Sequence, residues 1–254
     1  MFRAITLLAA AVLGLAGCGK TPAHTPAAAS QEPQAAYVSP PSVLSVTTAA
    51  SGVALVGAAP PDARIRLATP GGEARFAQAG AAGAWSLALP PSSDVRIFGL
   101  SAAAGGRQVQ AQGYVLISPD GRAGLLRAGA GALRLDRRPP SAVGAVDFDR
   151  EGSTVVSGTA PAQAYLSVEV DGAQAAQGRA DAQGRYSIAL QAPLRTGRHQ
   201  VTVVGDGVSE SARFEASPAG PLAPGPIHRQ VTPDGLRVDW PTPGGGIQST
   251  VLVN

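Results

Sequence analysis

The chain holds one cysteine, and its surroundings indicate what its thiol could do. Cys18 closes the stretch "LAGC", which follows the basic Arg3 and an uncharged, largely apolar run over residues 4–15. A basic start, a short apolar core and small residues at the end are typical of a cleaved secretory signal peptide. The run is shorter than the about 20 residues that span a bilayer, so we expect cleavage and no membrane-spanning helix here.

The same stretch resembles the lipobox of bacterial lipoproteins. In that family the cysteine thiol receives a diacylglycerol, the preceding peptide is removed, and the new amino terminus is acylated with a fatty acid such as palmitate. The resemblance implies that residues 1–17 are a lipoprotein signal peptide and that the lipid on Cys18 binds a membrane. Two or more acyl chains anchor a protein stably, whereas one does not. The alternative is a secreted protein with a chance cysteine at the cleavage point.

Gly19 follows the cysteine, where an aspartate commonly retains lipoproteins of Gram-negative bacteria at the inner membrane. The resemblance therefore implies transport to the outer membrane. It leaves open whether the protein faces the periplasm or the cell surface.

Three histidines could also carry catalytic or metal-binding chemistry. His24, His199 and His228 stand far apart, and none has the H-x-x-x-H spacing that brings two ligands together. No nucleophile elbow or phosphate-binding loop accompanies them. We therefore expect no enzyme, no cofactor and no metal centre, and we expect His199 to orient against the backbone.

Acidic residues give a weaker signal for calcium. Ca²⁺ needs six to eight oxygen ligands, and no segment supplies a complete oxygen-rich loop. Carboxylates alternating on a solvated strand are therefore the preferred interpretation, with a calcium site as the alternative. The residues concerned are Asp147, Asp149, Glu151, Asp171, Asp181 and Asp206.

Three aromatic residues could serve as binding platforms for a ligand. Trp85 and Tyr186 stand at equivalent points of an internal repeat, among apolar residues of period two, so we predict that both lie in the core. Trp240 has no counterpart in the repeat. We predict that it is the more exposed of the three, although a residue of this kind is more often part of a core than of a ligand site.

Composition excludes some classes of function. The chain has a formal net charge of +3, from 20 basic and 17 acidic residues. The arginines are scattered and do not alternate with aromatic residues, which argues against a nucleic-acid partner. A single cysteine allows no disulfide within the chain, so packing must supply the stability.

Two segments repeat at a constant offset of 101 residues, as from Gly57 to Gly158 and from Trp85 to Tyr186. An ungapped match over more than thirty positions indicates an internal duplication. Each copy contains short alternating stretches separated by turn residues, such as "RYSIAL" before a proline-containing turn and Asp171-Gly172 between two strands. This pattern predicts antiparallel strands in a β-sandwich.

Residues 153–217 resemble the bacterial immunoglobulin-like domains of envelope and adhesive proteins. The matching motifs are "VVSGTAPA", the Asp171-Gly172 hairpin, "ADAQGRYSI" and "LRTGRHQV". Residues 51–117 match less well, because the last of these motifs is lost. The resemblance implies an all-β chain with two tandem immunoglobulin-like sandwiches that act as spacers or binding modules and not as an enzyme.

The expected organisation has four parts. Residues 1–17 are the signal peptide, 18–42 a disordered Pro/Ala-rich tether, 43–138 the first domain and 139–254 the second. A Pro-Asp-Gly turn at residues 119–121 and another at 233–235 introduce strands that either form an appended meander or complete the sheets of each copy. The boundary is placed at residues 137–140.

Together these observations predict a non-enzymatic, lipid-anchored protein of the cell envelope. Its sandwiches would bind an envelope protein or peptidoglycan and act as a scaffold or assembly factor, with exposed edge strands as the contact. The alternative is a surface adhesin or a glycan-binding module.

Overall fold

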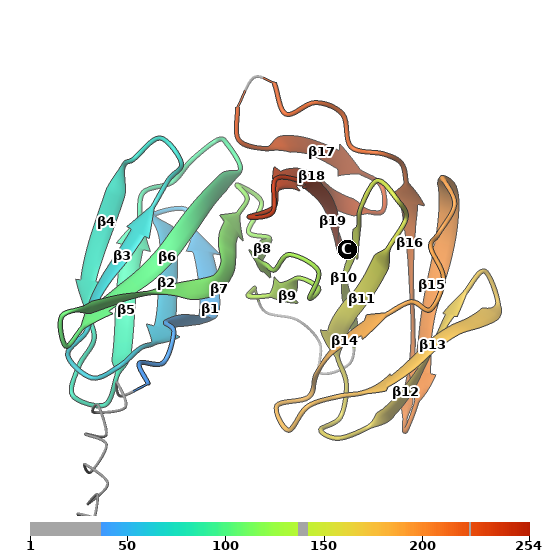
Figure 1. Cartoon of the computed structure of the whole chain (residues 1–254), viewed down its shortest axis with the longest axis horizontal. Helices are drawn as coiled ribbons and strands as arrows, with labels where there is room; N and C mark the ends of the chain where they lie inside the picture. Colours follow the sequence, from blue (N-terminus) through green and yellow to red (C-terminus); the bar gives the residue numbers. More distant parts are fainter. Residues whose placement is uncertain (1–36, 137–141, 224) are drawn as a thin grey trace, which may run out of the picture. The chain divides into compact units, whose positions relative to one another are not determined.

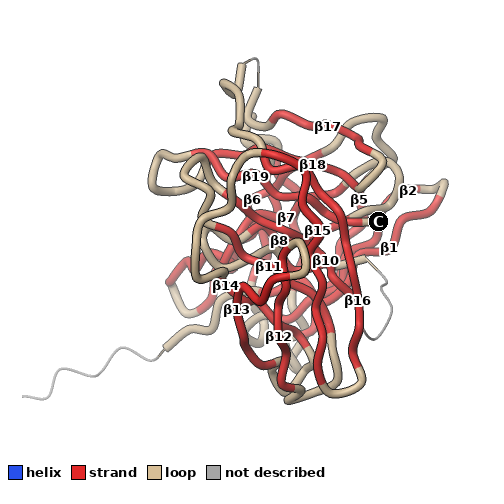
Figure 2. The backbone as a smooth tube through the Cα atoms, turned by 90° about the vertical axis from the view of Figure 1, so that its right-hand side faces the viewer, coloured by secondary structure: helices blue, strands red, loops and turns tan. Residues whose placement is uncertain are grey.

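The computed structural model describes residues 37–136, 142–223 and 225–254. Residues 38–254 form one compact unit. Within the described ranges every regular element is a β-strand, as Figure 2 shows. None of the described residues belongs to a helix that is long and apolar enough to cross a membrane.

The first copy consists of two antiparallel sheets (Figure 1). A three-stranded sheet has the order β1-β2-β5, and a six-stranded sheet has the order β4-β3-β6-β7-β8-β9. The chain crosses between the sheets after β2, β4 and β5, which is the immunoglobulin-like pattern. The strands are β1 (Ser42–Ala49), β2 (Gly52–Ala58), β3 (Arg64–Ala68), β4 (Ala74–Gln78), β5 (Ala84–Leu89), β6 (Arg96–Ala104), β7 (Arg107–Ile117), β8 (Ala123–Leu126) and β9 (Leu133–Arg134).

The second copy repeats this plan through its first seven strands, but its last three strands join the sheet of β10, whereas β8 and β9 join the sheet of β7. One sheet has the order β14-β11-β10-β19-β18-β17 and the other has the order β13-β12-β15-β16. The prediction of an all-β chain with two tandem immunoglobulin-like sandwiches is therefore confirmed. The strands are β10 (Ala142–Phe148), β11 (Thr154–Thr159), β12 (Tyr165–Val170), β13 (Ala173–Arg179), β14 (Arg185–Ala189), β15 (Gly197–Gly205), β16 (Val208–Ala216), β17 (His228–Thr232), β18 (Gly235–Pro241) and β19 (Ile247–Val253).

Each sandwich has its own apolar core, built by strands of period two. In β5 the side chains of Trp85, Leu87 and Leu89 are buried, while the residues between them are exposed. Successive side chains of a strand point to opposite faces, so this alternation fixes which face packs inward. Tyr186 takes the same place in the second core, so the prediction that Trp85 and Tyr186 are core residues is confirmed.

Each of these rings packs on a glycine of the neighbouring strand, so the two copies share this packing arrangement as well as the sequence pattern. A Cβ on Gly57 would lie 2.3 Å from the Trp85 ring, and one on Gly158 would lie 2.5 Å from the Tyr186 hydroxyl. Both distances are far below van der Waals contact, so only glycine lets the ring cross the strand at this point. The turns correspond as well, since Asp62 and Gln163 both have positive φ, at 56° and 65°.

The strands after each Pro-Asp-Gly turn complete the sheets of their own copy. Strand β19 pairs with β10, the first strand of the second copy. In the first copy the corresponding contact is a single hydrogen bond of 2.9 Å from the Val46 amide of β1 to the Leu135 carbonyl. The second of the two sequence-based alternatives therefore holds. The proposed boundary at residues 137–140 lies outside the described residues.

Candidate functional site

An apolar cluster joins the two copies. Leu116 and Leu126 of the first copy pack in one cluster with Leu236, Trp240 and Leu252 of the second. The ring of Tyr114 meets that of Trp240 edge to face, with centroids 6.0 Å apart at 79°, a favourable arrangement of two aromatic rings. The side chain of Trp240 is 0% exposed. The prediction that Trp240 is the more exposed aromatic is wrong, because a neighbouring copy covers it.

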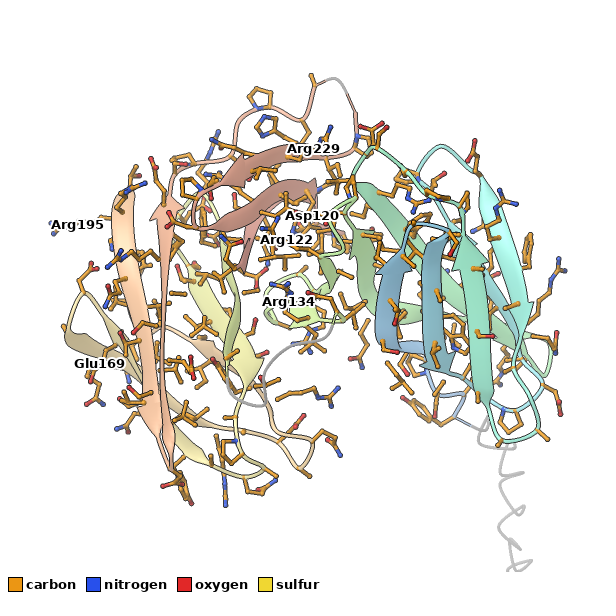
Figure 3. The ribbon with its side chains drawn as sticks, turned by 180° about the vertical axis from the view of Figure 1, so that it is seen from behind. Asp120, Arg122, Arg134, Glu169, Arg195 and Arg229 are labelled. Atoms are coloured by element: carbon orange, nitrogen blue, oxygen red, sulfur yellow. The ribbon has the colours of Figure 1, made fainter. Side chains whose placement is uncertain are left out.

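Polar contacts also join the two copies, and Figure 3 labels the three arginines that make them. Arg122 donates to the Asn254 side-chain oxygen at 2.6 Å, and Arg134 donates to the Val253 carbonyl at 2.7 Å. Arg229 of β17 reaches Asp94 of the first copy at 3.1 Å. These bonds fix the orientation of the two copies, whereas the apolar cluster supplies most of the free energy.

Asp147 is buried between the copies. Its carboxylate accepts hydrogen bonds from the Ala132 amide at 2.7 Å, from Gln248 at 3.1 Å and from the Thr250 hydroxyl. The side chain is 1% exposed, so the prediction that the carboxylates of this segment lie on a solvated strand is wrong for Asp147. All residues of β10 are buried, because the β8–β9 loop covers the face that an isolated sandwich would expose.

Burial raises the pKa of Asp147 to about 6, although hydrogen bonds from Thr250, Ala132 and Gln248 and the charge of Arg127 lower it in part. Desolvation disfavours the charged form, and here it exceeds the favourable contacts. The carboxylate therefore changes its charge near neutral pH while it holds the loop of the other copy.

The β8–β9 loop lies across β10, β11 and β14. Its Arg127 donates to the Ser187 hydroxyl at 2.9 Å and to the Gly131 carbonyl at 2.8 Å. The Ser157 hydroxyl donates to the Ala132 carbonyl at 2.6 Å. Gly131 sits so close to the sheet that a Cβ would lie 2.8 Å from Val155. Glycine at position 131 is therefore required for this close approach.

A second buried polar cluster has some residue types of a hydrolase. Asp239 accepts hydrogen bonds from Ser249 at 2.7 Å and from Arg237 at 2.8 Å, and its other oxygen lies 3.4 Å from His228. In a catalytic triad the histidine stands between the serine and the carboxylate. Here the carboxylate stands between the other two, so His228 cannot accept the proton of Ser249.

His199 is held by its neighbours, as the sequence predicts. One ring nitrogen lies 2.8 Å from the Arg195 carbonyl and the other 2.7 Å from Asp171. Burial lowers its pKa, but the bonds to Arg195 and Asp171 outweigh burial and raise it above the usual value. His199 therefore links β15 to the turn before β13.

The remaining acidic residues stabilise turns. Asp149, Asp171, Asp181 and Asp206 accept hydrogen bonds from backbone amides at 2.8–3.0 Å, and Glu151 is exposed. In the part of the chain that the structure describes, no three His, Cys, Asp or Glu side chains are grouped to hold a metal ion. Cys18 and His24 lie outside the described residues.

A free sheet edge runs along β16. The β15–β16 hairpin pairs Gly205 with Val208, so the even-numbered residues of β16 bond to β15. The amides and carbonyls of Ser209, Ser211, Arg213 and Glu215 therefore point away from β15, and no described strand pairs with them.

Two hollows flank this edge, with volumes of 510 and 360 Å³. The first is lined by residues 210–213 together with the start of β10, and the second by Phe214 and Glu215 together with β17 and the turn after it. No described strand pairs with the edge, and Pro233 and Asp234 of the β17–β18 turn line both hollows beside it. The sequence predicted edge strands in general but could not identify this one.

No protein-family model and no curated protein matches the chain. Among solved structures, a biofilm-associated protein BSP domain is similar at 15% identity and a TM-score of 0.26, over 74% of this chain and 30% of that chain. The central fibronectin-III array of RIM-binding protein is similar at 16% identity and a TM-score of 0.29, over 85% and 89% of the two chains. This chain thus spans less than a third of the first structure. Because both TM-scores are low, these similarities do not support the fold assignment. The assignment rests on the strand order within the sheets of this chain.

The pKa of Asp147 predicts how stability depends on pH. A carboxyl whose folded pKa is raised stabilises the folded state fully below its ordinary pKa of 3.8, and this contribution is lost as pH rises through about 6. Asp147→Asn removes this titration. When the pH falls from 7.5 to 4.5, we expect the free energy of unfolding of wild type to rise by on the order of 2 kcal/mol relative to that of Asp147→Asn. Urea unfolding of both chains at the two pH values measures this difference. A difference that does not change with pH would contradict the buried position of the carboxyl.

Proposed function

We propose that this protein is a lipid-anchored, non-enzymatic protein of the bacterial cell envelope that presents its immunoglobulin-like sandwiches to an envelope protein or to peptidoglycan. The observation that carries the proposal is the free edge of β16 with two hollows along it, both also lined by Pro233 and Asp234 of the β17–β18 turn. An extended segment can add to such an edge through backbone hydrogen bonds, while adjacent pockets bind every second side chain of the segment and give specificity.

The anchor is supported by the sequence. Cys18 stands at the end of "LAGC", after a basic residue and a short apolar run, and Gly19 follows it. Acylation of this thiol would consume the only cysteine of the chain. The protein would then be held at the outer membrane, facing the periplasm or the cell surface.

The joined copies support a scaffold more than a flexible spacer. A shared apolar cluster and the bonds to Asp147 hold the two sandwiches as one body. A partner bound at β16 is therefore presented in a fixed direction relative to the first copy, which is the property that a scaffold requires.

A glycan-binding module or surface adhesin is the alternative. The observation that favours it is a pair of exposed aromatic rings, Phe76 at 51% and Tyr165 at 65%, on corresponding sheets of the two copies. An arginine lies over each ring, Arg64 at 4.3 Å and Arg179 at 4.5 Å from the centroid. Protease treatment of intact cells distinguishes the two, because an adhesin is cleaved from the surface and a periplasmic scaffold is protected.

Lipid labelling tests the anchor. Cells grown with a radiolabelled fatty acid are expected to label the wild-type chain and not Cys18→Ser, because only the thiol starts the modification. The wild-type chain should also remain in the membrane fraction. Equal labelling of both chains, or no labelling of either, would overturn the anchor.

Two substitutions at one position test the β16 edge. Ser211→Pro removes an amide that points away from β15, and Ser211→Ala removes the same hydroxyl but keeps the amide. In cross-linked pull-downs of the tagged full chain from the cell envelope, we expect Ser211→Ala to capture the wild-type partner in wild-type amount and Ser211→Pro to lose most of it.

A melting curve of each variant controls for folding. Equal capture by a folded Ser211→Pro chain would contradict partner binding at β16.

A further inference from the structure

The same face of the sheet is covered in one copy and bare in the other. In the second copy, Ala145 and Ser157 on the outer face of β10 and β11 are 0% exposed, because the β8–β9 loop lies on them. The corresponding residues of the first copy are Ser45 and Val56, since β1 and β10 shift register at the same point and β2 matches β11 at the offset of 101. Val56 is 43% exposed, and Ser45 is exposed as well.

The bare face carries no charge. We define it as the outward residues of β1, β2 and β5, which are small or apolar and which face solvent in the described chain. Covering such a face does not require the desolvation of any ion. Its members are Leu44, Ser45, Thr47, Ala49, Ala54, Val56, Ala58, Ala84, Ser86 and Ala88.

The loop that covers the second copy also has an unused counterpart. Aligning the two Pro-Asp-Gly turns matches β8 and β9 with β18 and β19 in the sequence, so the β8–β9 loop over residues 127–132 corresponds to residues 241–246, the end of β18 and the β18–β19 loop. The two strand pairs join opposite sheets of their copies, since β8 pairs with β7 and β19 pairs with β10. Both loops are rich in glycine, and Gly131 and Gly245 both have positive φ, at 75° and 86°. Residues 243–246 are exposed.

We propose that the β18–β19 loop of one molecule docks on the bare face of β1, β2 and β5 of a second copy of this chain. The chain itself shows that a glycine-rich loop of this kind fits a face of this kind, since the first copy docks on the second in this way. In that contact Gly131 lies against Ser187, with a Cβ position 3.2 Å from the hydroxyl oxygen. The equivalent contact between molecules brings residues 243–246 to Ser86.

The two surfaces are different, so the association is head to tail. A contact of this kind builds either a closed ring or an open chain of molecules, and the open chain leaves one loop and one face free at its ends. The apolar cluster around Trp240 is already used within each chain, so it does not contribute to this contact. In the β8–β9 loop Arg127 binds Ser187, but the equivalent position before the β18–β19 loop is Pro241, which offers no such bond. The contact is therefore weaker than the one inside the chain. It does not depend on a lipid anchor, but confinement to a membrane would strengthen it by raising the local concentration.

Cysteine cross-linking tests the arrangement in the full chain, which has no cysteine besides Cys18. Ser86→Cys marks the face, and Gly244→Cys marks the loop at a position where a Cβ meets nothing within 4 Å. With two differently tagged chains and a bismaleimide, we expect the mixture of Ser86→Cys and Gly244→Cys to give a mixed dimer. Gly220→Cys replaces Gly244→Cys as the control, because it marks another exposed glycine with open space around it.

The expected yield of mixed dimer is several-fold above the control mixture and above either single variant alone, and Val56→Arg in the face should reduce it to the level of the control. Wild type gives the background from Cys18. A yield equal to the control overturns the proposal. Efficient cross-linking of Ser86→Cys with itself also overturns it, because that result shows that two faces pack together. A melting curve confirms that each variant is folded.

Discussion

The burial of Trp240 between the copies is the interaction on which the rest of the structure depends. Its ring packs against Tyr114 and the leucines of the first copy, and its indole N–H donates to Thr250 at 3.0 Å. Thr250 in turn donates to Asp147, which accepts the Ala132 amide of the β8–β9 loop. The apolar cluster and the covering loop are thus joined through a continuous set of hydrogen bonds, which satisfies the buried Trp240 indole, the Thr250 hydroxyl and the Asp147 carboxylate.

This junction makes the two copies unequal. Duplication alone would give two sandwiches with the same surfaces, yet one loop covers β10 and β11 while the face of β1 and β2 stays open. The junction also fixes the direction of the β16 edge relative to the first copy. The edge of β16 is free because β17, β18 and β19 join the sheet of β10, and the face of β1 and β2 is free because no loop of the described chain covers it.

The sequence predicted the parts of the fold that are local or repeated. Period-two alternation in "RYSIAL", the Asp171-Gly172 turn and the offset of 101 indicated two similar sandwiches, and they placed Trp85 and Tyr186 in the cores. Each of these features depends on residues within one copy. The pairing of β19 with β10 was harder to predict, because the two strands lie about a hundred residues apart and no local pattern identifies the partner.

The errors at Trp240 and Asp147 share one cause. Both predictions follow from the sequence of a single sandwich, whereas a segment from the other copy covers each of these residues. A signal was present in β10, where Asp147 is the one charged residue of an otherwise apolar strand from Ala142 to Phe148. Such a run is typical of a strand that is buried on both faces.

The central claim is that the two sandwiches form one cooperative unit. Differential scanning calorimetry tests it most directly, because the ratio of the van't Hoff enthalpy to the calorimetric enthalpy reports how much of the chain unfolds together. The account predicts a single transition with a ratio close to one. Two resolved transitions, or one broad transition with a ratio close to one half, would show that the sandwiches unfold independently and would contradict it.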